Sequence, residues 1–143
     1  MYESLTRYLL ELPGDEKGMW IIDRESDGTS EHPVQMPYVN YSKLIRNFTA
    51  DVCSFVEAHE EMELNHYSDI LEANGIKWRK DSMSAASVEN LDAKCVLALI
   101  LGAVRAERFC DGALLGFFEN GSIERWIERL KELDTDGENV VAK

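Results

Sequence analysis

Apolar side chains recur every three or four residues along most of the chain, the spacing at which one face of an α-helix repeats. Residues 2–12 carry the first such stripe, and Pro13-Gly14 predicts where that helix stops. Ser42 is placed to cap a second helix, whose apolar stripe extends to Val56. The pattern therefore predicts a mainly α fold.

One segment is apolar without interruption, from Cys95 to Val104. A helix that is apolar on every face is buried on every face. We therefore expect a central core helix here, beginning near Val88 with Ser87 as its cap and spanning the core over 92–104. Gly102 is expected to let a neighbouring helix approach closely. The run is about half of the roughly 20 residues that a membrane-spanning helix needs, so no membrane segment is expected.

The remaining helices are shorter or lie nearer the C-terminus. A short helix is expected over 67–73 and a last one from Ser122 to Leu133, with a connector over 77–87 and a helical turn near 114–118. Residues after Asp134 resemble a frayed tail, 135–143. The chain is thus expected to be one compact helical bundle over 1–134, because 143 residues is a common size for a single domain.

A different pattern interrupts the helices near the N-terminus. Residues 19–22 are rich in strand formers, Asp27-Gly28 is a turn signal, and residues 34–41 could return beside the first run. The returning segment contains two prolines, which restrict it to an edge strand or an extended loop. A small β-hairpin is therefore predicted here.

The net charge of the chain indicates which classes of binding partner are disfavoured. The chain carries 27 Asp and Glu against 15 Lys and Arg, a formal net charge of −12. Nucleic-acid binders depend on Lys and Arg to neutralise phosphates, so direct nucleic-acid binding is disfavoured. Lys77, Arg79 and Lys80 form the one basic cluster of note. The acidic surface favours solubility.

Cys53, Cys95 and Cys110 match neither a disulfide framework nor a zinc-ligand spacing. Free cysteines in apolar surroundings behave as small hydrophobic residues and are typical of a reducing compartment. The first 16 residues lack the features of a signal peptide. A cytoplasmic protein without a cofactor or bound metal is therefore expected.

The most unusual stretch leaves the core helix directly, with Arg105, Glu107, Arg108 and Asp111 among seven residues. Charges at the edge of a core are costly to desolvate unless they are paired. In one interpretation the two guanidiniums bind a carboxylate or phosphate, and Glu107 or Asp111 orients them. In the favoured interpretation the four groups form an internal ion-pair network that holds a helix–turn–helix junction together.

Three weaker motifs have simpler explanations. Cys110 next to two arginines could be a nucleophile, but a packed thiol is favoured over it. His59 and His66 bracket an acidic stretch that could hold a metal only if the chain folded back, so a solvated loop is favoured. Residues 23–31 resemble the start of a calcium loop, but Val34 stands where the bidentate Glu is required.

Several phrases of the sequence together resemble a bacterial family described only as a domain of unknown function, DUF6508. The matching residues are Pro37-Tyr38, Tyr41-Ser42, Asn65, Tyr67, Gly121, Ile123, Arg129-Leu130-Lys131 and, most specifically, Glu107-Arg108-Phe109-Cys110-Asp111-Gly112. The resemblance implies a bacterial, cytoplasmic, mostly helical protein. It brings no activity, cofactor or catalytic residue.

Two hypotheses of function remain. The first, which ranks ahead, is a non-enzymatic binding or regulatory module, acting through a protein partner or a second copy of itself. Its contacts would come from exposed members among Tyr38, Tyr67 and Trp78. The second is a site for an anionic small molecule, enzymatic or sensory, formed by these residues: Arg105, Glu107, Arg108 and Asp111, with Asn65 and Tyr67 as further lining.

Overall fold

The computed structural model describes the backbone of residues 1–22, 29 and 36–142, and the side chains of these ranges up to residue 134. A small antiparallel hairpin accompanies the helices, so the predicted mainly α fold is confirmed. The helices within those ranges are α1 (Glu3–Thr6), α2 (Lys43–Ala58), α3 (Tyr67–Ala73), α4 (Lys80–Ala85), α5 (Ala93–Ala106), α6 (Ala113–Glu119) and α7 (Ser122–Ala142). The 3₁₀ turns are η1 (Arg7–Leu10), η2 (Leu12–Gly14), η3 (Glu60–Met62), η4 (Leu64–His66) and η5 (Val88–Asn90).

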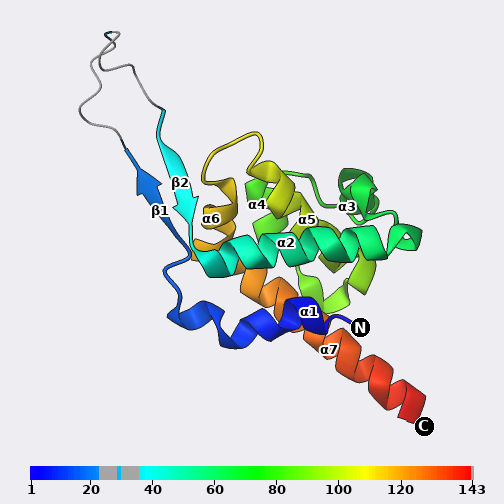
Figure 1. Cartoon of the computed structure of the whole chain (residues 1–143). Coiled ribbons are helices and arrows are strands. Elements are labelled where there is room, and N and C mark those ends of the chain that lie inside the picture. The colour runs from blue at the N-terminus through cyan, green and yellow to red at the C-terminus, as the bar shows by residue number, and fades with distance from the viewer. Residues whose placement is uncertain (23–28, 30–35, 143) are drawn as a thin grey trace.

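Helix α5 occupies the centre of the molecule. Every residue from Cys95 to Val104 is buried. Helices α2, α3, α6 and α7 all contact it, and Figure 1 shows α2 lying across it. The prediction of a central core helix is confirmed. None of the helices within the described residues is long and apolar enough to cross a membrane.

The predicted start of this helix is wrong. Asp92 caps α5 by accepting a 2.9 Å hydrogen bond from the Cys95 amide, and the helix begins at Ala93. Ser87 makes no side-chain cap bond and precedes only η5. Leu91 is extended between the two, which separates η5 from α5. An apolar stripe cannot show this break, because a 3₁₀ turn and an α-helix place residues three apart on nearly the same face.

The expected connector over 77–87 contains a helix, α4. Only Met83 of α4 is fully buried, so six residues offer too little periodicity to reveal the helix. Met83 and Trp78 both lie against Gly102, where a Cβ would approach Met83 Cε to 3.2 Å. The close approach at Gly102 is thus made by the side chains of Trp78 and Met83, and the Trp78 indole also donates to the Gly102 carbonyl at 3.0 Å.

The hairpin stands out from the helical body (Figure 1). Strand β1 (Gly18–Ile21) pairs antiparallel with β2 (Tyr38–Tyr41), in a register that sets Gly18 opposite Tyr41. The predicted hairpin is confirmed. Its expected turn and the calcium-like segment lie outside the described residues.

Two carboxylates hold the N-terminal segment to the helices. Asp51 of α2 accepts hydrogen bonds from Tyr8 and Arg7, and these lower its pKa. Asp134 of α7 accepts from the amino group of Met1 and the amide of Tyr2. The segment predicted as one helix over 2–12 is divided into α1, η1 and η2, so the prediction of a continuous helix is wrong.

The last helix begins differently from the prediction. Ser122 is its first residue rather than its cap, and the Asn120 side chain accepts from the Ser122 amide at 3.0 Å. The bounds of α7 include residues 135–142, whose side chains are not described. The predicted frayed tail over 135–143 stays a prediction.

The cap of α5 provides a direct test of this fold. We expect Asp92→Ala to lower the free energy of unfolding by about 1 kcal/mol, because one amide at the helix start loses its acceptor. Ser87→Ala, at the position that the sequence suggested, should change it by less than about 0.5 kcal/mol. Urea denaturation followed by circular dichroism measures both. Equal effects of the two substitutions would contradict the assigned helix start.

Candidate functional site

The six candidate residues do not form one site. Arg105, Glu107 and Arg108 line one hollow, and Arg105 also lines a second hollow together with Asn65. Asp111 lines a third hollow, and Tyr67 packs edge-on against Trp78 nearby. The three hollows are called below the arginine pocket, the acidic cleft and the apolar groove.

Glu107 is occupied with holding the α5–α6 junction. Its carboxylate accepts from the amides of Gly112 and Leu114, both at 3.0 Å. It also accepts at 2.5 Å from the hydroxyl of Tyr41, which in turn accepts from the Leu115 amide at 3.0 Å. Glu107 and Tyr41 thus satisfy three amides at the start of α6, which would otherwise lack acceptors.

Tyr41 ties this junction to the hairpin, and the charged stretch alone did not identify it. Burial and the hydrogen bond to Glu107 raise the pKa of Tyr41, so the hydroxyl stays a donor. Gly112 has a φ of +88°, and a Cβ there would lie 2.2 Å from the Trp20 ring of β1. Only glycine fits such a left-handed turn under an aromatic ring.

The prediction that Arg105 and Arg108 form an ion-pair network with Glu107 and Asp111 is therefore wrong. Within the described residues, neither arginine of the charged stretch forms an ion pair with Glu107 or Asp111. Backbone amides and Tyr41 take the carboxylate of Glu107 instead. The stretch does clamp the junction, but it does so through Glu107 alone and leaves Arg105 and Arg108 available.

The arginine pocket, of about 370 Å³, lies between α2 and the end of α5. Arg46 joins Arg105 and Arg108 there, although it lies nearly 60 residues away in the sequence. None of the three guanidiniums makes a side-chain hydrogen bond or ion pair to the rest of the described chain. The pocket is lined by Tyr41, Arg46, Thr49, Cys53, Val104, Arg105, Glu107, Arg108 and Leu114.

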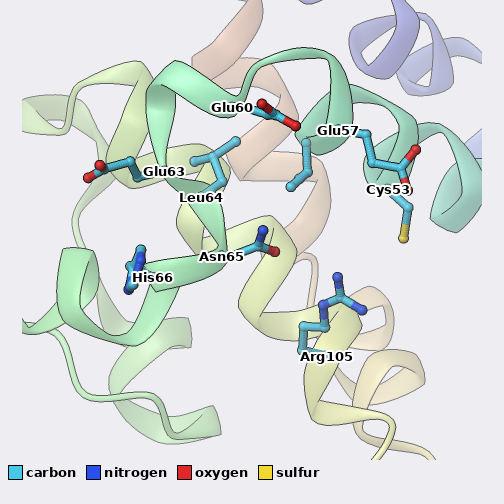
Figure 2. Close-up of a pocket in the computed structure, with 9 residues that line it drawn as sticks. Cys53, Glu57, Glu60, Glu63, Leu64, Asn65, His66 and Arg105 are labelled. Atoms are coloured by element: carbon cyan, nitrogen blue, oxygen red, sulfur yellow. The ribbon is translucent and has the colours of Figure 1, made fainter.

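The acidic cleft, of about 440 Å³, lies beyond Arg105 toward the C-terminal end of α2. Figure 2 shows Arg105 and the amide of Asn65 directed into the space below the α2–η3 turn, with Glu60 above them. Glu63 and His66 extend on the side away from Arg105. The cleft is lined by Cys53, Val56, Glu57, Glu60, Glu63, Leu64, Asn65, His66 and Arg105.

The apolar groove, of about 430 Å³, lies between α4 and the α5–α6 junction. Trp78, Met83, Phe109 and Phe117 supply its apolar lining. Trp78 packs edge-on against both Tyr67 and Phe109, with ring centroids 5.3 and 5.6 Å apart. Phe109 is nevertheless 77% exposed. Arg79, Lys80 and Asp111 provide the charges at this groove.

The weaker motifs resolve as follows. Cys110 is exposed, so the expectation of a packed thiol at this junction is wrong. His59 stacks on Phe55 and its ring contacts the Phe55 carbonyl at 2.9 Å. Among the described residues no group of His, Cys, Asp and Glu is arranged to hold a metal ion.

The Glu107 junction yields a stability prediction. Glu107→Gln should cost about 1–3 kcal/mol, because the new amide turns a donor toward donors and leaves a half-buried group unpaired. Glu119→Gln, on the exposed end of α6, is the matched control and should be near neutral. Urea unfolding measures both variants. A neutral Glu107→Gln would refute the capping role.

The cysteines yield a reactivity prediction. Burial raises the pKa of Cys95 to about 11, so at pH 8 its thiol stays protonated and covered. A chromogenic disulfide reagent should modify Cys110 first and Cys95 only after unfolding. The fast phase should disappear in Cys110→Ser and persist in Cys95→Ser. Its loss in Cys95→Ser would contradict the described burial.

Comparison with known proteins places the chain in a family but adds no activity. No match was found among curated proteins or among solved structures. The bacterial source and cytoplasmic location implied by the resemblance stay predictions. A family profile, described as a family of unknown function (DUF6508), matches residues 4–136, which is most of the chain. The chain therefore belongs to the DUF6508 family.

Proposed function

We propose that the protein is a non-enzymatic binding module whose apolar groove receives an acidic, apolar-anchored segment of another protein. The observation that carries the proposal is Phe109, a large aromatic side chain left 77% exposed at the groove. Exposed apolar residues that gather in one place are typical of protein-interaction surfaces, whereas isolated ones are common on any protein.

The apolar surface continues from the groove onto the hairpin. Gly112 lines the groove, and the Trp20 ring lies directly against it. Trp20 is 44% exposed, whereas Ile21 beside it and Val39 opposite it are partly buried. Among the described residues of the hairpin and its flanks, the exposed apolar side chains are Met19, Trp20, Ile22, Met36 and Tyr38, of which Met19 and Tyr38 lie on the face opposite to Trp20. Aromatic and methionine side chains of this kind are enriched at protein interfaces.

The charges at the groove favour an acidic segment as its occupant. Arg79 and Lys80 line the groove, and Lys77 precedes Trp78 in the sequence, in a chain whose net charge is −12. Arg79 is paired with Asp81, but Lys80 has no ion pair within the described part of the chain. Because salt screens charges more than about 8 Å apart, these local cations rather than the net charge would meet a docked segment.

The same argument ranks a partner above a second copy. In a contact through the groove, a symmetric dimer would bring two equal cationic clusters toward each other, and like charges at an interface oppose association. The predicted homo-oligomer is therefore kept as an outcome of the test.

The test selects random 12-residue peptides on the immobilised protein. Enriched sequences should combine an aromatic or aliphatic anchor with flanking Asp or Glu. A synthetic consensus peptide should bind at least tenfold more weakly to Phe109→Ala, which removes a side chain exposed in the free protein. Fluorescence anisotropy measures the Kd. Lys80→Gln should also weaken binding and flatten its salt dependence.

Leu10→Ala is the matched control, since Leu10 is 89% exposed and does not line the groove. It should bind the peptide as the unmodified protein does. Enrichment of basic peptides, or unchanged binding by Phe109→Ala, would overturn the proposal. Sedimentation analysis addresses self-association: a dimer that dissociates on Phe109→Ala would replace the acidic partner with a second copy.

A further inference from the structure

The arginine pocket and the acidic cleft adjoin each other. Cys53 of α2 and Arg105 of α5 line both, so the two hollows meet at these residues. Together they form one trough that follows α2 from Arg46 to Glu57 and continues to Glu60. The trough lies outside the apolar groove and shares no lining residue with it.

The two ends of the trough carry opposite charges. Arg46 and Arg108 stand at one end, and Glu57 and Glu60 stand at the other, with Arg105 between them. No side chain of these five makes a hydrogen bond or ion pair with another described residue. Among the described residues that line the arginine end, Glu107 is the one acid, and Tyr41 and two amides already donate to it. The separated charges are thus free to meet a ligand.

We propose that this trough binds a small molecule with an anionic group at one end and a protonated amine at the other. Guanidiniums match carboxylate and phosphate oxygens as paired donors, so the anionic group belongs at Arg105 and Arg108. The amine belongs at Glu57 and Glu60. A ligand with only negative charges would be repelled by the acidic end. The proposal goes beyond the binding-module function and does not rest on it.

Helix geometry sets the length of the ligand. An α-helix rises about 1.5 Å per residue, so Glu57 lies roughly 6 Å along α2 from Cys53, where Arg105 stands. The amine should therefore be about 6 Å or more from the anionic group. Val56 and Leu64 in the cleft, and Val104 and Leu114 in the pocket, offer apolar contacts to the carbon chain between the charges. The volumes of about 440 and 370 Å³ suit a small metabolite.

Isothermal titration with 6-aminohexanoate tests the proposal, and its single-charge analogues hexanoate and hexylamine serve as references. 6-Aminohexanoate should bind at least tenfold more tightly than either analogue, because only it reaches both ends. Glycine, whose charges are too close together, should bind as weakly as the analogues. 6-Aminohexyl phosphate distinguishes the source of the anion: tighter binding than 6-aminohexanoate identifies a phosphate ligand, and weaker binding identifies a carboxylate.

Substitutions of exposed residues at the two ends of the trough test the arginine end and the glutamate end one at a time, without disturbing the core. Arg108→Gln should weaken 6-aminohexanoate and hexanoate alike by at least fivefold. Glu60→Gln should weaken 6-aminohexanoate and leave hexanoate unchanged or tighter. Matched controls are Lys94→Gln and Glu128→Gln, exposed residues outside both the trough and the apolar groove, which should bind as the unmodified protein does. Circular dichroism confirms that each variant is folded.

Three results would overturn the proposal. One is equal affinity for 6-aminohexanoate and hexanoate. Another is undiminished binding by Arg108→Gln. The third is loss of 6-aminohexanoate binding in Phe109→Ala, which would place the site in the apolar groove. Because Phe109 does not line the trough, failure here leaves the peptide test of the groove unaffected.

Discussion

The burial of α5 on all sides is the constraint on which the rest of the structure depends. Ten consecutive apolar residues must be removed from water, and each fully buried Val, Leu or Ile side chain among them contributes about 1.5–3 kcal/mol. One amphipathic helix can cover only part of such a surface. Helices α2, α3, α6 and α7 are therefore needed around it, and their polar faces become the outer surface of the protein.

The same constraint explains why charge gathers where α5 ends. The chain leaves the core at Arg105 and must turn at once into α6, whose first amides need acceptors. The Glu107 carboxylate accepts from two of these amides, and the Tyr41 hydroxyl accepts from a third. Because Tyr41 belongs to β2, the same hydrogen bonds hold the hairpin to the junction. Because Glu107 is used in this way, Arg105 and Arg108 have no carboxylate partner among the described residues, and they line the hollow beside α2.

Two surfaces of different character result from this arrangement. The apolar groove and the hairpin expose aromatic side chains beside the basic cluster, whereas the trough along α2 separates arginines from glutamates. The two surfaces would bind by different forces. Binding at an apolar face is favoured because apolar surface is removed from water. Binding at the charged trough is favoured because charged side chains exchange water for charge-assisted hydrogen bonds to the ligand. A protein with both could bind a partner and a small molecule at once.

The sequence by itself determined the mainly α fold, the central helix and the hairpin, because hydrophobic periodicity depends only on local spacing. It also identified the stretch from Arg105 to Gly112 as unusual. Only the tertiary structure decided how that stretch is used: the Tyr41 hydroxyl donates to Glu107, and Arg105 lines one hollow with Arg46 and another with Glu60, across dozens of residues of sequence. Arg46, Cys53 and Glu57 do follow one edge of α2, but that spacing cannot show which polar edge another helix covers. Such contacts depend on how the helices pack against α5, and the spacing of apolar residues within one helix does not specify that packing.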